Sequence, residues 1–557
     1  MAPMPLRFFQ SQWTSLSAHL ALLCRTPLLF LHVQLTSLSA RLTRLFLGLR
    51  ARESAGLDSP DNLPSTLPST PASQDKGDDL AATDGQVSCA QIQQEASIFF
   101  PLTEEQIEAK NRTFIDSIDQ DAVCLVASKY FGGDACSIID EKKGSFNICF
   151  FVRFESNNKT WVLRIPIVPM VPYRAWGKLL SEVTTMRYIE SKTTIRIPHV
   201  HAYGKDDTLV QGASTPFMIV EFIPGRQLDT KTWMHTTESQ RRNLYIDLIN
   251  AFTQLRKLEF PAAGSLMPNP NDESNPILGP FLSITARELE RSCGTPATLG
   301  VFTSTAQFAD YHCNILSATA KEPVQDDNLN GVKMELFALD SILKEIPRCI
   351  DLQEPSSLFI LAHADLRCGN ILVDDDFHIL AIIDWEFSGT IPLQLFTPPP
   401  WIMGHDPATS YVYTGISGRD IFPEFRTLLM EMRNSSSACA QLCQDWGIQD
   451  QAARDEEFVL KVSPIMEIFR HPSRLNDIYY MSIFERLFGS NACKDIVANE
   501  FFEKDENQAL AQQVELQMWN SERYTEYLVK HGLFVEDPRA QRIQEFLEKT
   551  KHLVKDK

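Results

Sequence analysis

Hydrophobic and polar positions divide the chain into a mixed region, up to about residue 225, and a mostly helical region after it. Residues 103–119 have helical periodicity, with Thr103 as N-cap and Gln106 in the reciprocal position of a capping box. Two apolar, β-favouring runs, 146–155 and 160–167, are separated by a Ser-Asn-Asn-Lys turn signal, which predicts a hairpin. Residues 174–193 again have helical periodicity, and 216–225 predict a strand that ends at Pro-Gly.

The second region is predicted to be helical from about residue 229 to 350, with a break at 268–276. A short apolar hairpin follows within 361–401, and a long helical tail continues to Lys557. The pattern therefore predicts an α+β protein with a small β-rich lobe, residues 89–225, and a large helical lobe, residues 226–557.

The N-terminal 50 residues differ in composition from the rest of the chain. They contain no Asp or Glu, several Arg, many Ser and a Leu stripe at helical spacing. This composition is typical of a mitochondrial presequence. The alternatives are a helix or unstructured tail of a cytoplasmic protein, or a membrane anchor built on the uncharged stretch 26–40, which is short for a span. Residues 51–88 are rich in Ser, Pro, Thr and Asp and are predicted to form a disordered linker.

Charge and cysteine usage exclude some classes of function. The net charge of −19 argues against a nucleic-acid-binding protein, since such proteins carry a basic surface. The 12 cysteines are scattered, and Cys439 and Cys443 form the only close pair, so reduced thiols are expected rather than a zinc site. The sequence indicates no firm membrane span and does not fix an oligomeric state.

The stretch HADLRCGNILVDDDFHILAIIDWE, residues 363–386, concentrates the candidate chemistry. Two short apolar runs flank a polar turn and predict a β-hairpin, with Asn370 entering one end and Asp384 leaving the other. Because an antiparallel hairpin brings its outer ends together, these two oxygen ligands should face one point, as a hard cation such as Mg²⁺ requires. Asp365 lies five residues before Asn370 and could accept a proton from a hydroxyl group.

The spacing His-x-Asp-x4-Asn, followed by Asp after a hairpin, resembles the catalytic and metal loops of the kinase superfamily. The sequence of residues 363–386, including Asp384-Trp385, is similar to the aminoglycoside phosphotransferase family, and residues 382–402 resemble a largely uncharacterised fungal branch of it. The resemblance implies a bilobal protein-kinase-like fold. It also implies that Asp365 is the catalytic base, that Asn370 and Asp384 hold Mg²⁺, that Arg367 contacts the transferred phosphate, and that His363 braces the loop.

The resemblance also implies a nucleotide site in the small lobe. Such a lobe has a turn over the phosphates, a basic residue on the next strand and a carboxylate on the following helix. Arg164 stands where the family pattern has lysine, and an arginine is not equivalent to it. Glu221 and Ile223 would offer backbone groups to an adenine ring. The remaining positions implied are Gly144, Ser145 and Asn147 for the turn and Glu182 for the helix carboxylate.

Two classes of function follow. The first is an ATP- and Mg²⁺-dependent phosphotransferase that moves the γ-phosphate to a hydroxyl of a small-molecule acceptor, with a protein or lipid-related acceptor as the other option. The second is a pseudokinase, a nucleotide-binding or scaffold protein with little turnover. The intact set of Asp365, Asn370 and Asp384 favours the first, and Arg164 favours the second.

Overall fold

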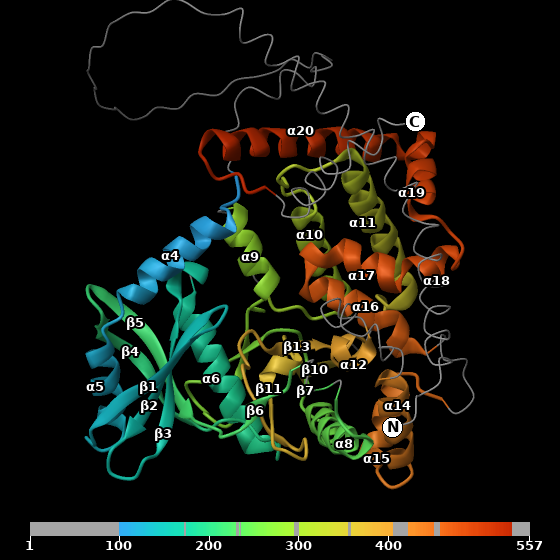
Figure 1. The fold of residues 1–557 in the computed structure, drawn as a ribbon. Coiled ribbons are helices and arrows are strands. Elements are labelled where there is room, and N and C mark those ends of the chain that lie inside the picture. The colour runs from blue at the N-terminus through green and yellow to red at the C-terminus, as the bar shows by residue number, and fades with distance from the viewer. Residues whose placement is uncertain are drawn as a thin grey trace, which may run out of the picture. The chain divides into compact units, whose positions relative to one another are not determined.

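An antiparallel five-stranded sheet forms the small lobe of the computed structural model, in the order β1-β2-β3-β5-β4 (Figure 1). The structure describes residues 100–171, 174–229, 233, 235–293, 300–354, 358–404, 421–449 and 457–536. The predictions for residues 1–50 and 51–88 lie outside these ranges. The strands are β1 (Cys136–Lys143), β2 (Asn147–Phe154), β3 (Thr160–Pro166), β4 (Val200–Val210) and β5 (Ala213–Glu221).

Several local predictions for this lobe are confirmed. The helix α4 (Glu104–Asp116) begins at Thr103, and both hydrogen bonds of the capping box with Gln106 are present. The strands β2 and β3 pair antiparallel as the predicted hairpin. The helical pattern of residues 174–193 corresponds to α6 (Ala175–Lys192).

Strand alternation decides which side chains of β3 face which helix. Leu163 and Ile165 belong to a core that also contains residues of α5 (Gln120–Tyr130), such as Val123. Val162 belongs to the other core, together with Leu179 of α6. Since alternate residues of a strand point to opposite faces, Arg164 shares the face of Val162 and is directed towards α6.

The large lobe begins where the chain leaves the sheet. Strand β6 (Arg226–Gln227) pairs with β11 (Ile371–Val373), which forms the predicted hairpin with β12 (Ile379–Ile382). A second small sheet has the order β13-β10-β7. Its strands are β7 (Glu259–Phe260), β10 (Phe359–Ala362) and β13 (Gly389–Pro392), while β8 (Ser265–Met267) pairs with β9 (Ile277–Gly279).

Helices make up most of the large lobe (Figure 1). The predicted helical region up to residue 350 contains four helices among the described residues, and the predicted helical tail continues to residue 530. The described helices of the whole large lobe are α8 (Glu238–Leu255), α9 (Ile284–Cys293), α10 (Thr305–Thr319), α11 (Leu329–Cys349), α12 (Pro400–Met403), α14 (Ile421–Arg433), α15 (Ser437–Asp445), α16 (Phe458–Arg470), α17 (Leu475–Ser482), α18 (Phe484–Phe488), α19 (Lys494–Phe502) and α20 (Gln508–Lys530).

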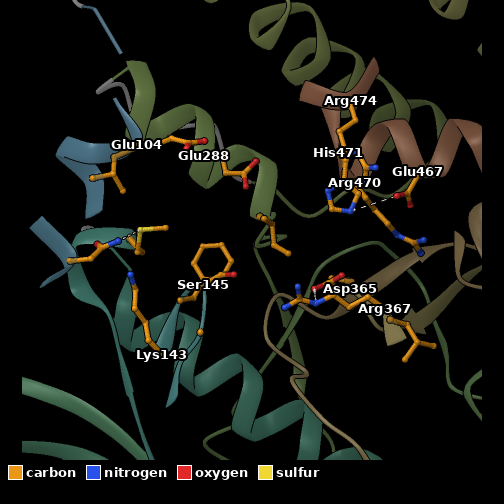
Figure 2. A pocket seen from close by; sticks show the side chains of 18 of the residues that line it. Glu104, Lys143, Ser145, Glu288, Asp365, Arg367, Glu467, Arg470, His471 and Arg474 are labelled. Carbon is orange, nitrogen blue, oxygen red and sulfur yellow. Dashed lines mark hydrogen bonds and ion pairs between the residues drawn. The ribbon is translucent and has the colours of Figure 1, made fainter. Parts of the chain in front are cut away.

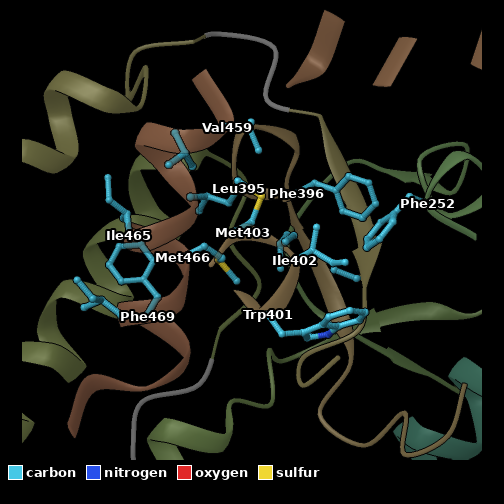
Figure 3. Packing of buried hydrophobic residues seen from close by; sticks show 14 of the residues in the cluster. Phe252, Leu395, Phe396, Trp401, Ile402, Met403, Val459, Ile465, Met466 and Phe469 are labelled. Atoms are coloured by element: carbon cyan, nitrogen blue, oxygen red, sulfur yellow. The ribbon is translucent and has the colours of Figure 1, made fainter. Parts of the chain in front are cut away.

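The core of this lobe supports the loops that carry the candidate site. Figure 3 shows Trp401, Ile402 and Met403 of α12 beside Met466 and Phe469 of α16, all buried. Because α16 turns these apolar residues towards the core, the polar residues near its end lie on a different side of the helix.

The fold confirms the predicted class: a bilobal kinase-like protein with an antiparallel N-terminal sheet and a helical C-terminal lobe. Among the described residues, no helix combines the length and the apolar character that crossing a membrane needs.

Candidate functional site

The β11–β12 hairpin brings the two predicted metal ligands to one place. Ile371 pairs with Ile382, and the backbone N–H of Ile383 donates to the carbonyl of Asn370 at 2.9 Å. Asn370 therefore stands at the same end of the hairpin as Asp384, as the sequence predicted. The Asn370 side-chain amide donates to the backbone carbonyl of Asp365 at 2.7 Å, which fixes the loop before the hairpin.

The loop around Asp365 is held by two neighbours. The buried His363 accepts at Nδ1 from the Asp365 backbone N–H at 3.1 Å, and its Nε2 lies 3.0 Å from the Ile383 carbonyl. This is the bracing position expected for His363. Arg367 Nε lies 3.0 Å from Asp365 Oδ2, and 58% of its side chain is exposed. The guanidinium of Arg367 can thus reach a ligand beside the Asp365 carboxylate.

Arg164 makes the predicted pair with Glu182 and a second one that the sequence did not reveal. Its Nη1 lies 2.6 Å from Glu182 Oε1 and its Nη2 lies 2.8 Å from Asp384 Oδ1. Burial alone would lower the pKa of Arg164, but the Glu182 and Asp384 carboxylates outweigh burial and raise it. One forked guanidinium therefore joins the helix carboxylate to the candidate metal ligand, a geometry that the ammonium of lysine cannot copy.

Asp384 adopts a backbone conformation that is uncommon for a residue with a side chain. Its φ is 66°, in the left-handed region, where Asp and Asn are tolerated better than most residues. Phe387, three residues later, has a φ of 57°. The chain thus makes a sharp turn directly after β12, and this turn directs the Asp384 carboxylate towards Arg164 of the small lobe.

Sequence reasoning missed a second buried cation next to Arg164. Lys178 of α6, with only 2% of its side chain exposed, forms an ion pair with Glu386 and lies 3.3 Å from Asn147 Oδ1. Asn147 Nδ2 donates to Glu386 at 2.8 Å. Burial and the nearby Asp384 carboxylate raise the pKa of Glu386 to about 7, although Lys178 opposes the shift. The Lys178 ammonium also lies over the ring of Phe387 at 5.4 Å.

This cluster ties the predicted phosphate turn to the candidate metal loop. Phe146 packs edge-on against Phe387 with ring centroids 5.0 Å apart, beside the bond between Asn147 and Glu386. Asn147, predicted to contact the nucleotide from the turn, therefore has its side chain engaged inside the protein. A signal for Lys178 existed in the sequence, because it lies one helical turn before Glu182 on the same face of α6.

A cavity of about 940 Å³ opens beside Asp365 (Figure 2). Its volume is in the range of small-molecule sites. Gly144 and Ser145 of the turn line it, as do Asp365 and Arg367, so the structure brings these four predicted residues together. Gly144 has little room for a side chain, since an added Cβ would lie 3.3 Å from the Asn147 carbonyl oxygen.

The same cavity contains residues that the sequence did not flag. Arg470 and His471, at the end of α16, and Arg474, in the short helix η6 (Pro472–Arg474), line it on the side of Asp365. They belong to the predicted helical tail, where no motif indicated a role. Figure 2 shows them above Asp365 and Arg367, while Glu104 and Glu288 stand on another side.

The two predicted adenine contacts lie elsewhere, at the junction between the lobes. The Glu221 backbone N–H donates to the His199 carbonyl at 2.9 Å, and the Ile223 carbonyl accepts from the Gly225 N–H at 2.8 Å. Neither residue lines the cavity beside Asp365. A nucleotide contacting both regions would have to span from this junction to the turn at Gly144.

Comparisons with known proteins agree with this geometry. Residues 150–394 match the model of the phosphotransferase enzyme family, APH. This match confirms that residues 150–394 resemble the phosphotransferase family.

Two proteins called "Altered inheritance of mitochondria protein 9, mitochondrial" are among the curated relatives. The one from Zygosaccharomyces rouxii is 22% identical over 414 residues, covering 63% of this chain and 64% of the relative. The one from Clavispora lusitaniae is 29% identical over 141 residues, covering 24% of this chain and 22% of the relative. The chain thus spans less than two thirds of the length of these relatives.

A similar solved structure is the GDP complex of wild-type aminoglycoside 2'-phosphotransferase-IIIa. It is 13% identical, has a TM-score of 0.37, and the likeness covers 72% of this chain and 99% of that one.

Proposed function

We propose that this protein is an ATP- and Mg²⁺-dependent phosphotransferase that moves the γ-phosphate of ATP to a hydroxyl of a small molecule. The observation that carries the proposal is the hairpin geometry, which sets Asn370 beside Ile383 and Asp384 at one end. The Asp365 carboxylate, on the preceding loop, lines a cavity large enough for an acceptor.

Asp365 is the base in this proposal. The acceptor hydroxyl oxygen attacks the γ-phosphorus, the bond from that phosphorus to the bridging oxygen of ADP breaks, and the hydroxyl proton passes to Asp365. Arg367, which lies 3.0 Å from Asp365 Oδ2, steadies the carboxylate and offers positive charge to the phosphoryl group. Asn370 keeps the loop in place through its bond to the Asp365 carbonyl.

The candidate metal ligands suit Mg²⁺ in their chemistry. An amide and a carboxylate oxygen are hard ligands, and Mg²⁺ usually completes its shell with water and substrate phosphates. Bound there, Mg²⁺ would neutralise phosphate charge during transfer. Asp384 would hold the metal with its carboxylate while Arg164 keeps that carboxylate oriented at 2.8 Å.

Two substitutions test the proposal. Asp384→Asn keeps a residue that tolerates the left-handed φ of 66° but removes the charge, so Mg²⁺-dependent ATP binding should be lost. Asp365→Asn should leave ATP binding nearly intact and lower turnover about a hundred- to ten-thousand-fold. ATP binding is measured by thermal shift with and without Mg²⁺, and turnover by ADP release with a metabolite extract.

The matched control is Asp375→Asn, in the exposed turn of the same hairpin, which should change neither quantity. An unchanged Mg²⁺-dependent shift in folded Asp384→Asn would refute the metal assignment. An equal loss of binding and turnover in Asp365→Asn would make Asp365 a structural residue instead.

A specific observation favours a second candidate function, a pseudokinase. Arg164 already occupies one oxygen of Asp384, the oxygen that a metal would otherwise compete for. If Arg164 keeps the site closed, Arg164→Ala should leave ATP affinity unchanged or raise it. If Arg164 instead steadies the phosphates of a bound nucleotide, the same substitution weakens ATP binding, and this is the result we expect.

Location belongs to the same proposal. The names of the relatives from both fungi include "mitochondrial", and residues 1–50 have the composition of a presequence. We therefore expect residues 1–50, fused to a fluorescent reporter, to direct it to mitochondria. A diffuse cytosolic signal would favour the cytoplasmic alternative.

A further inference from the structure

The cavity beside Asp365 has an uneven distribution of charge. Three arginines gather on the side of the catalytic loop and of the end of α16, where Asp365 and Glu467 also lie, while carboxylates of α4 and α9 stand on another side, where Lys143 pairs with Glu108 (Figure 2). The cations on the first side are Arg367, Arg470 and Arg474, and the carboxylates on the other are Glu104, Glu108 and Glu288.

Arg470 is the cation that most needs a ligand. Its Nε is buried and has no hydrogen-bond partner within the part of the chain that the structure describes. Burial lowers the pKa of Arg470 by more than the Glu467 and Asp365 carboxylates raise it. A buried guanidinium donor without an acceptor costs free energy. Because Arg470 also lines the cavity, an anionic group there would compensate its charge.

His471, next to Arg470, does not add to the positive charge of this side of the cavity. Burial is the main cause that lowers the pKa of His471 to about 4, and Arg470, Arg474 and Arg367 lower it further against the opposing effect of Asp365. Glu467 Oε1 lies 3.7 Å from His471 Nε2. The imidazole is therefore neutral near pH 7, so the positive charge at this wall comes from the arginines.

From this arrangement we infer that the acceptor carries an anionic group, a carboxylate or a phosphate, which Arg470 binds with help from Arg474 and Arg367. The inference rests on the proposed function, since it deepens the site around Asp365. An acceptor held by Arg470 would present a neighbouring hydroxyl to Asp365, which lines the same cavity.

The phosphate chemistry that suits Arg470 could also come from the nucleotide. Gly144 and Ser145, the predicted phosphate turn, line the same cavity, so the γ-phosphate of ATP would enter it as well. The two sources differ in one measurable respect. An acceptor group binds together with a nucleotide, whereas an anion that occupies the γ-phosphate position is displaced by ATP but not by ADP.

The test uses the full-length protein and titration calorimetry. The probes are 3-phosphoglycerate, which has a hydroxyl, a carboxylate and a phosphate, and glycerol as its neutral counterpart. Each is titrated alone, with saturating ADP and Mg²⁺, and with saturating non-hydrolysable ATP analogue and Mg²⁺. We expect 3-phosphoglycerate to bind in all three conditions and glycerol to bind in none.

Variants of Arg470 connect binding to this residue. Arg470→Gln should weaken 3-phosphoglycerate binding about ten- to a hundredfold, the usual effect of losing a hydrogen bond between two charged groups. Arg470→Lys should recover part of it, which guards against misfolding as the cause. The control Arg242→Gln removes an equal charge from an exposed pair with Glu431 on α14 and should have no effect.

Two results would overturn the inference: no Arg470-dependent binding of the anion, or displacement of the anion by the ATP analogue alone. Failure of the proposed function would look different. The wild-type protein would then bind the anion but show no Mg²⁺-dependent ATP binding or no turnover.

Discussion

Two groups of buried charge lie close together in this molecule, and they are built differently. In the first, between α6 and the loop after β12, each cation contacts carboxylates at short range: Arg164 with Glu182 and Asp384, and Lys178 with Glu386. In the second, at the end of α16, Arg470 has a buried donor without an acceptor among the described residues. The first group is held by direct ion pairs, although Arg164 Nε also has no acceptor among the described residues, whereas Arg470 is influenced by the nearby carboxylates of Glu467 and Asp365.

This difference suggests that the first group stabilises the fold and that the second group binds a ligand. Substituting one residue of a buried ion pair leaves its partner as an uncompensated buried charge, which is strongly destabilising. Removing Arg470 breaks no direct ion pair of this kind within the described part of the chain, and it relieves repulsion from neighbouring arginines while leaving the buried Glu467 with less positive charge nearby. Stability measurements should therefore distinguish the two groups, whatever the acceptor is.

The largest effect is expected at Lys178. Lys178→Met leaves the buried Glu386 and Asn147 without their cation and should lower the free energy of unfolding by about 3–5 kcal/mol. Chemical denaturation measures it. The double variant Lys178→Met, Glu386→Gln should recover much of the loss, because no charge is then left unpaired. Lys344→Met, which removes an exposed pair with Asp340, is the control and should cost at most about 1 kcal/mol.

A smaller effect is expected when the fork of Arg164 is replaced. Arg164→Lys keeps the charge but cannot contact Glu182 and Asp384 with two separate nitrogens, so it should lose about 1–3 kcal/mol of stability. The same denaturation experiment applies. A variant as stable as the wild type would show that one of the two contacts contributes nothing to the free energy of unfolding.

At the end of α16 the expected change in stability is close to zero. Arg470→Gln should alter the free energy of unfolding by less than about 1 kcal/mol, or raise it, because a like charge near Arg474 and Arg367 is removed. A loss as large as that of Lys178→Met would place Arg470 in a group like the first and would remove the contrast between the two.

The last expected effect appears only in acid, where His471 is protonated. The folded-state pKa of His471 is about 4, below the value of about 6.5 expected in the unfolded chain, so the unfolded chain binds the proton more tightly between these values. The stability contributed by keeping His471 neutral is present above pH 6.5 and is lost as pH falls towards 4. His471→Gln should flatten this part of the stability profile, measured by denaturation at several pH values, while His235→Gln in an exposed position should not. An unchanged slope in His471→Gln would contradict the shifted pKa.

The parts that the sequence predicted are those that depend on short-range patterns. The capping box at Thr103 and the β11–β12 hairpin follow from residues near each other in the chain. The roles of Arg164 and Glu182 were implied by the family resemblance, and the structure places the two side chains in contact.

The parts that were not predictable depend on elements far apart in the sequence. Lys178 meets Glu386 only because α6 packs beside the loop after β12, and no periodicity in either segment contains that information. Arg470 reaches the cavity because α16 turns its apolar side, with Met466 and Phe469, to the core (Figure 3). A helical pattern identifies the apolar side of a helix but not the pocket that its polar side will meet.

The position of α4 has a consequence for motion between the lobes. Glu108 of α4 forms an ion pair with Lys143 beside the turn at Gly144, and Asn111 contacts Met170, so α4 is attached to the small lobe. Just before α4, the ring of Phe100 packs against Tyr524 of α20, 5.5 Å away, and the Pro101 carbonyl accepts from the Tyr524 hydroxyl.

Besides the Arg164–Asp384 and Lys178–Glu386 ion pairs, the small lobe is tethered to the large lobe by the chain at 222–225 and through α4. A hinge rotation that opened the cleft would have to bend the short segment between Pro101 and Thr103 or separate Phe100 from α20. The aromatic contacts of Phe100, just before α4, therefore limit how far the cleft can open.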